Sequence, residues 1–265
     1  MKLLKAMAIA FSIYSKIPVP QFEWKEEDME YMMCFFPWIG GVIGLFFFGW
    51  AVLCEKFAVG NVCYALIGAA IPLMISGGFH VDGYMDTMDA FHSYQSREKK
   101  LEILKDSHIG AFAAIMLALY YMIDIAAISE IHTQKAVSAL AAVFFLARCF
   151  SGIAVMTLQP AKKEGLLYTF ASSAQKVMVK AALYFQTVLC VVLMLLVSGW
   201  YGAAAIGAVL LSFFYFKKKS YKELGGITGD TAGFFVTVCE AAAAAAVAVT
   251  CLLYTSDAAD DLLCV

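Results

Sequence analysis

The sequence is short of charge. Asp, Glu, Lys and Arg supply 15% of its 265 residues, and hydrophobic residues supply 62%. Soluble domains carry about a quarter of their residues as charged side chains. The mean hydropathy is also high, at +0.78. A water-soluble fold would lack the charged side chains to cover its surface, so the composition predicts a protein with lipid around it.

Other features are also missing. The net charge of −2 gives none of the basic excess that nucleic-acid binding requires. The 8 cysteines include no CxxC pair, so the sequence indicates neither a disulfide framework nor a zinc site. Residues 1–20 hold lysines and an apolar stretch, but no small-residue cleavage site follows. This pattern favours a retained amphipathic helix over a signal peptide.

Seven apolar windows reach or approach the length of about 20 residues that a membrane helix needs. The sequence therefore predicts an all-α, polytopic membrane bundle with about seven transmembrane helices behind the N-terminal amphipathic helix. It forms one domain over residues 1–254. The shortest window is the sixth, and the seven are 35–54, 61–79, 109–129, 136–157, 178–198, 201–216 and 231–254.

Long and short connections alternate between these windows, which predicts that every long polar segment lies on the same side of the membrane. The long segments contain 15 of the 19 Lys and Arg residues. Positively charged loops stay in the cytoplasm, so we expect that side to be cytoplasmic. The four segments are 1–34, 80–108, 158–177 and 217–230.

The last residues of the sequence differ in composition from the rest of the chain. Residues 255–265 read TSDAADDLLCV, an acidic stretch that looks like translated sequencing-adapter read-through. We therefore interpret it as an artefactual tail and leave it out of the functional argument.

An acidic cluster follows the second window, in GGFHVDGYMDTMDAF at 77–91. Asp82, Asp86 and Asp89 are spaced i, i+4 and i+7, which stacks three carboxylates on one helix face. Such like charges repel, and a bound cation removes that cost. Oxygen ligands without cysteine or suitably spaced histidine suit Mg²⁺. The pattern predicts a magnesium site, with a solvated acidic loop as the alternative.

Basic residues and a further aspartate follow in REKKLEILKDSHIG at 97–110. Basic groups beside a carboxylate–metal cluster fit a phosphate-bearing substrate. An amphipathic helix that binds anionic lipid headgroups is the alternative. The residues concerned are Arg97, Lys99, Lys100, Lys105 and Asp106.

Two more polar segments are expected on the same side. LGGITGDTAG at 224–233 forms a glycine-rich turn before the last window, and Asp230 stands at the helix start. Such a turn can cradle phosphate, although it can also be a plain helix connection. QPAKKEGL at 159–166 adds charges that fit either substrate binding or ordinary cytoplasmic loops. The candidate residues here are Gly225, Gly226, Thr228, Gly229, Lys162, Lys163 and Glu164.

Charged residues also fall inside the apolar windows. Arg148 and Glu240 lie on the order of 13 Å below the cytoplasmic surface if each residue rises about 1.5 Å. Unpaired charges at that depth are costly, so we expect them to pair or to line a polar cleft. Asp124 and Lys180 are nearer to window ends and are expected to snorkel.

Several motifs, taken together in their order, give the sequence a family resemblance. They are FSIYSKIPVP at 11–20, FFPWIGGVIG at 35–44, the two segments at 77–91 and 97–112, ARCF at 147–150, AKKEGL at 161–166, GGITGDTAG at 225–233 and Glu240. In these features the sequence resembles the cobalamin synthase family, the adenosylcobinamide-GDP ribazoletransferases. It departs from the family pattern at Lys16, His108 and Leu167, where arginine, arginine and glycine are usual.

The resemblance implies a bacterial cytoplasmic membrane enzyme whose active site faces the cytoplasm. Such enzymes join adenosylcobinamide-GDP to α-ribazole or its 5′-phosphate with Mg²⁺ and release GMP. It implies that Asp82, Asp86 and Asp89 hold Mg²⁺, and that Asp106 or Asp230 completes the metal shell or accepts a proton. The remaining substrate contacts would come from Lys105, Arg148, Lys162, Glu240 and the turn Gly225–Gly229. The oligomeric state stays open, with a homo-oligomer among the options.

Three other protein classes fit the composition. A CDP-alcohol phosphotransferase would have a DGxxAR run, and DGYMDTMD has no Ala-Arg pair. A prenyltransferase would have a second aspartate-rich loop of DDxxD type, which is absent from the sequence. A transporter would use Arg148 and Glu240 near the bilayer midplane. Because most polar groups are expected on one face, an enzyme is favoured over a transporter.

Overall fold

The structure is a computed structural model that describes residues 2–20, 23, 25–162 and 164–262. These residues form eleven α-helices and one short 3₁₀ helix, and they contain no β-strand. One isolated bridge pairs Pro160 with Ile227. The prediction of an all-α fold is confirmed.

The N-terminal helix is present as expected. Helix α1, Lys2–Tyr14, buries one side through Ala6, Ile9, Ala10 and Tyr14. The 3₁₀ helix η1, Glu26–Met29, follows before the first long helix. An amphipathic helix therefore packs against the bundle at its N-terminus, in agreement with the sequence analysis.

Six helices are long and apolar enough to cross a membrane. The predicted windows match them well, except that 201–216 is too short. The helix there continues to Leu224, because its last two turns are lysine-rich and lysine is a good helix former although it lowers the hydropathy. The six helices are α2 Met32–Lys56, α6 Ala111–Ile128, α7 Gln134–Thr157, α9 Lys176–Ser198, α10 Trp200–Leu224 and α11 Gly229–Leu262.

The window at 61–79 behaves differently from the other six. Helix α3, Asn61–Ser76, spans only about 24 Å and ends before Gly77 and Gly78. Both glycines have left-handed backbones, with φ of 66° and 85°, which other residues rarely adopt. The chain bends by 97° there, and helix α4, Phe79–His92, begins. We therefore treat α3 as the second membrane crossing and α4 as a helix outside the spanning segments.

Helix α7 is the central helix of the bundle. It is the most enclosed of the candidate spans, with 72% of its apolar window buried. Its neighbour α2 approaches it closely at Gly40 and Gly44, where a side chain would overlap the Phe144 and Ala141 carbonyl oxygens. Small residues of this spacing let membrane helices pack backbone to backbone. The outer helix α9 presents Val188 and Leu196 outward, as expected of a lipid-facing helix.

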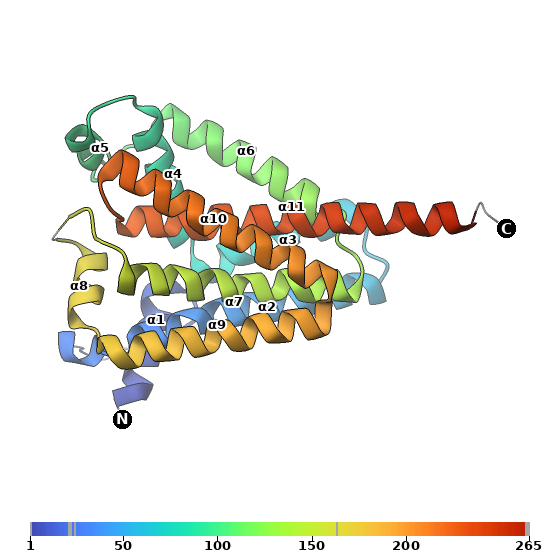
Figure 1. Cartoon of the computed structure of the whole chain (residues 1–265), viewed down its shortest axis with the longest axis horizontal. Helices are drawn as coiled ribbons and strands as arrows, with labels where there is room; N and C mark the ends of the chain where they lie inside the picture. Colours follow the sequence, from blue (N-terminus) through green and yellow to red (C-terminus); the bar gives the residue numbers. More distant parts are fainter. Residues whose placement is uncertain (1, 21–22, 24, 163, 263–265) are drawn as a thin grey trace.

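The polar segments gather at one end of the bundle. Helices α4, α5 (Arg97–Ile103) and α8 (Leu166–Ser173) lie together at the left end of the long axis in Figure 1. They belong to two of the four long polar segments, and residues of all four line a common cavity described below. The prediction that these segments share one side is therefore confirmed by the packing. Helix α11 begins at this end and extends past the opposite end of the other helices.

The two deep charges pair with each other. Arg148 donates from Nη1 to Glu240 Oε1 at 2.7 Å and to the Phe144 carbonyl oxygen at 2.8 Å. The exposed fractions of the two residues are 1% and 6%. The expectation of an ion pair is confirmed. Neither residue lines the cavity, and their role in substrate binding stays a prediction. Asp124 is also buried beside them and does not snorkel.

This pair gives a stability prediction. Glu240→Leu leaves the Arg148 charge buried without its carboxylate, and we expect it to lower the free energy of unfolding by about 3–5 kcal/mol. The double variant Arg148→Met/Glu240→Leu removes both charges and should recover most of the loss. Thermal unfolding of the purified protein in detergent measures both effects. A double variant less stable than the single variant would contradict the assignment.

Candidate active site

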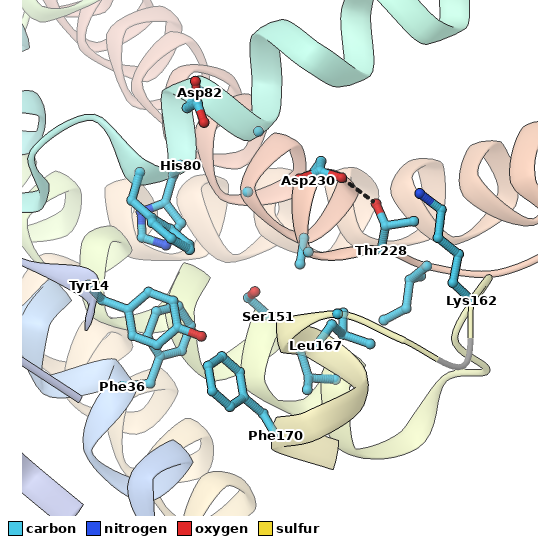
Figure 2. Close-up of a pocket in the computed structure, with 18 of the residues that line it drawn as sticks. Tyr14, Phe36, His80, Asp82, Ser151, Lys162, Leu167, Phe170, Thr228 and Asp230 are labelled. Atoms are coloured by element: carbon cyan, nitrogen blue, oxygen red, sulfur yellow. Dashed lines mark hydrogen bonds between the residues drawn. The ribbon is translucent and has the colours of Figure 1, made fainter. Parts of the chain in front are cut away.

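A cavity of about 560 Å³ opens at the polar end of the bundle. This volume lies within the usual range of small-molecule sites, about 300–1,000 Å³. Its wall comes from α1, α2, α4, α7, α8, α11 and the loops between them, and Figure 2 shows its residues converging on a common space. The charged and hydroxyl residues predicted as site residues that line it are Asp82, Lys105, Lys162, Thr228 and Asp230.

Two aspartates from distant parts of the sequence meet here because α4 and α11 cross closely. A Cβ atom on Gly83 would lie 2.8 Å from the Asp230 carbonyl oxygen, and one on Gly233 would lie 3.0 Å from that of His80. Only glycine permits this approach without a shift of the backbone. The crossing places Asp82 of α4 and Asp230 of α11 in the same wall, as Figure 2 shows.

The start of α11 is fixed by reciprocal capping. The Thr228 hydroxyl accepts from the Thr231 N–H at 3.1 Å, and the Thr231 hydroxyl accepts from the Thr228 N–H at 2.8 Å. Thr228 also donates its hydroxyl proton to Asp230 Oδ2 at 3.3 Å. This arrangement satisfies the Thr231 N–H in the first turn and orients the Asp230 carboxylate, which lines the cavity.

Two lysines supply positive charge. Lys105 pairs with Glu164 at 2.5 Å, and Lys162 donates to the Leu101 carbonyl oxygen at 2.9 Å. Burial, and then the Lys105 charge, lower the pKa of Lys162. Both lysines line the same cavity as Asp230. Lys163, also named by the sequence analysis, lies outside the described residues.

Asp86 is the second aspartate of α4. Partial burial, followed by the charges of Asp82, Asp230 and Asp89, raises the pKa of the Asp86 carboxyl to about 7. The predicted repulsion between stacked carboxylates is therefore present. Asp86 does not line the cavity, and it lies one helical turn from Asp82 on the same face of α4.

Asp89 has a different role from the predicted one. Its two carboxylate oxygens accept from the N–H groups of Gly110 and Ala113, at 2.7 Å and 2.9 Å, and so cap α6. Among the described residues, no three Asp, Glu, His or Cys side chains are grouped to hold a metal ion. The three-aspartate metal set is therefore not assembled, because Asp89 is used to anchor the next helix.

Three other predicted residues lie outside the cavity. Asp106 sits on a turn with 57% of its side chain exposed and pairs with His108 at 2.6 Å, so its predicted catalytic role is not supported by its position. Gly225 ends α10 with a left-handed φ of 72°. Gly226 packs against the backbone at Gln159. These two glycines shape the connection before α11, whereas Gly229 lines the cavity as expected.

Sequence analysis missed the apolar half of the cavity. Tyr14, Phe36, His80, Ser151 and Phe170 line it, and they come from α1, α2, α4, α7 and α8. In the sequence these residues read as ordinary core positions of separate helices. Only His80, set between two glycines and an aspartate in GGFHVDG, carried a signal that could have found it.

The fold and the cavity define a class: a polytopic helical membrane protein with an acidic and basic site at one end of its bundle. Comparison with known proteins gives the family. The family model of cobalamin-5-phosphate synthase matches residues 6–248, and the chain belongs to this family.

Individual relatives carry a consistent name. An adenosylcobinamide-GDP ribazoletransferase of Lachnoclostridium phytofermentans is 44% identical over 94% of this chain and 95% of its own. Those of Clostridium botulinum strain Alaska E43 and Azorhizobium caulinodans are 31% and 29% identical, over 90% and 91% of this chain and 94% of their own. No solved structure matches the chain.

The crossing of α4 and α11 can be tested by one methyl group. Gly83→Ala places a Cβ against the Asp230 backbone, which must then shift. We expect kcat to fall about tenfold or more, because small misplacements of reacting groups cost that much. Gly49→Ala is the matched control on α2, where a Cβ would meet no described atom within 4 Å. Equal activity in the two variants would contradict the importance of this contact.

Asp86 gives a pH prediction. The folded protein keeps this proton up to about pH 7, whereas an unfolded aspartate loses it near about pH 4. The folded state therefore binds more protons between these values, and the raised pKa costs stability as pH rises through them. Asp86→Asn lacks this cost. In metal-free buffer the Tm of the variant relative to the parent should increase from pH 5 to pH 8, and a flat difference would contradict the shift.

Proposed function

We propose that this protein transfers the adenosylcobinamide phosphoryl group from adenosylcobinamide-GDP to α-ribazole or its 5′-phosphate and releases GMP. The observation that carries the proposal is the convergence of Asp82 and Asp230, with Lys105 and Lys162, in one cavity at the polar end of the bundle. Family membership and the shared name of the relatives support it.

The reaction is a displacement at phosphorus. An oxygen of the acceptor's ribose hydroxyl forms a bond to the phosphorus that carries the cobinamide. The bond from this phosphorus to the bridging oxygen of the diphosphate breaks, and that oxygen leaves with GMP. Such transfers depend on positioning and charge neutralisation more than on a covalent nucleophile.

Asp230 is the residue suited to accept the hydroxyl proton. One of its oxygens accepts from Thr228, which orients the carboxylate and leaves the other oxygen open to the cavity. A carboxylate within hydrogen-bond reach of the attacking hydroxyl can act as a general base. Asp106, the other candidate from the sequence, does not line the cavity, and its carboxylate pairs with His108.

Lys105 and Lys162 are suited to contact the diphosphate. Both line the cavity, and both stand on loops beside its acidic wall. Ammonium groups aimed at the phosphate oxygens offset the negative charge that builds up during transfer. Glu164 holds Lys105 at the cavity in the absence of substrate.

The acidic wall fits Mg²⁺. Its donors are carboxylate oxygens, and magnesium commonly uses one or two protein carboxylates together with water and substrate phosphates. Asp82 would hold the ion, and Asp86 stands one turn behind it on the same face of α4. When bound, Mg²⁺ neutralises phosphate charge and favours departure of the GMP oxygen.

We further propose that the cavity faces the cytoplasm of a bacterial cell and that the protein resides in the cytoplasmic membrane. The four segments that contribute to the cavity hold 15 of the 19 Lys and Arg residues. The positive-inside rule orients such segments toward the cytoplasm.

Two aspartates with opposite predicted outcomes test the site. Asp82→Asn should lower GMP release by at least about a hundredfold, because it removes a charge from the cavity wall. Asp106→Asn should keep activity near that of the parent, because Asp106 lies on an exposed turn. The assay uses purified protein with adenosylcobinamide-GDP, α-ribazole and Mg²⁺, and omission of Mg²⁺ should abolish release. Near-parental activity of Asp82→Asn would refute the site.

A further inference from the structure

The cavity has two chemically different ends. Its charged end contains Asp82, Asp230 and the lysines, and its other end is built largely of aromatic rings, as Figure 2 shows. The rings of Tyr14, Phe36 and Phe79 lie around His80 at that end, and Phe170 contacts Tyr14. The His80 ring is parallel to the Tyr14 ring, with an interplanar angle of 2° and 6.1 Å between centroids. The Phe36 and Phe79 rings both lie 5.7 Å from it.

His80 itself has no partner for its polar atoms. It is 5% exposed and lines the cavity, and neither ring nitrogen forms a hydrogen bond within the described part of the chain. A buried polar group left without a partner destabilises the folded state. Such groups are few in native structures, and a functional role is one of the reasons that a fold retains them.

The surroundings of the ring narrow the choice of ligand. His80 is 5% exposed and is enclosed by the rings of Tyr14, Phe36 and Phe79. An imidazole ring can donate an N–H to an acceptor atom. In such an apolar enclosure, a flat ligand with a single acceptor atom is buried at lower cost than a charged phosphate group.

We propose that the aromatic end of the cavity binds the planar base of the acceptor nucleoside, and that His80 donates a hydrogen bond to the one free ring nitrogen of that base. This inference rests on the proposed function. Aromatic side chains favour flat rings in stacked or edge-on contact. A benzimidazole base is a flat bicycle whose free nitrogen is its only remaining polar atom, so it matches an apolar wall with one available donor.

The guanine of the GDP group matches this end poorly. Its edge carries several donors and acceptors, and each would lose its hydrogen bond to water in an aromatic cage. The charged end is also the end that suits the diphosphate. His80, Asp82 and Asp230 line the same cavity. A base held at His80 therefore leaves its ribose within the cavity that also contains Asp82 and Asp230.

Binding without turnover tests the inference. Calorimetric titration of the full-length protein in detergent with α-ribazole gives the affinity of the parent and of His80→Phe, which keeps the ring but removes both nitrogens. We expect binding at least tenfold weaker in His80→Phe and partial recovery in His80→Gln, which restores an N–H donor. GDP affinity should change less than twofold. His132→Phe is the matched control, because His132 is exposed at the opposite end of the bundle.

The outcomes separate the inference from the proposed function. Parental α-ribazole affinity in His80→Phe overturns the inference, as does a loss of GDP affinity in its place. Phe170→Ala opens the aromatic end of the cavity without changing His80, and it should also weaken α-ribazole binding at least threefold. This variant tests the inference even if the His80 variants fail to fold. If the parent binds α-ribazole in a way that depends on His80 but releases no GMP, the proposed function fails and the subsite stands.

Discussion

The site depends on the contact between α4 and α11. The backbones of these helices touch because Gly83 faces the Asp230 carbonyl and Gly233 faces that of His80. Any larger side chain would separate them and move Asp82 away from Asp230. Partial burial, together with the charges of Asp82, Asp230 and Asp89, raises the pKa of Asp86 beside this contact. Perturbed pKa values of this kind cluster at functional sites.

The charges of the molecule divide into two groups with different roles. Arg148 and Glu240 satisfy each other inside the bundle, which is where an unpaired charge would be most costly. Asp82, Lys105 and Lys162 lie at the polar end, where water and substrate can reach them. Depth in the bundle thus separates structural pairing from chemistry. The transporter interpretation loses its main support, because Arg148 and Glu240 are paired with each other.

Helix capping explains why one predicted metal ligand is not available. Asp89 has the spacing of a third ligand, but it stands opposite the first turn of α6, where N–H groups lack partners within the helix. Bonding to two of them anchors α6 to α4. On the same face of α4, Asp82 lines the cavity and Asp89 caps α6. The spacing of the aspartates in the sequence does not distinguish these two roles.

The sequence by itself determined that this protein is a membrane protein, where its helices lie and that its polar segments share one side, because hydropathy and charge can be read locally along the chain. It also identified Asp82 and Asp230, since aspartates beside glycines at helix starts are locally visible. Tertiary structure alone decided that Asp106 lies apart from the cavity and that α3 and α4 bend at Gly77. It also decided that His80 enters an aromatic cage, because that cage is assembled from residues far apart in the chain, whose proximity depends on helix packing.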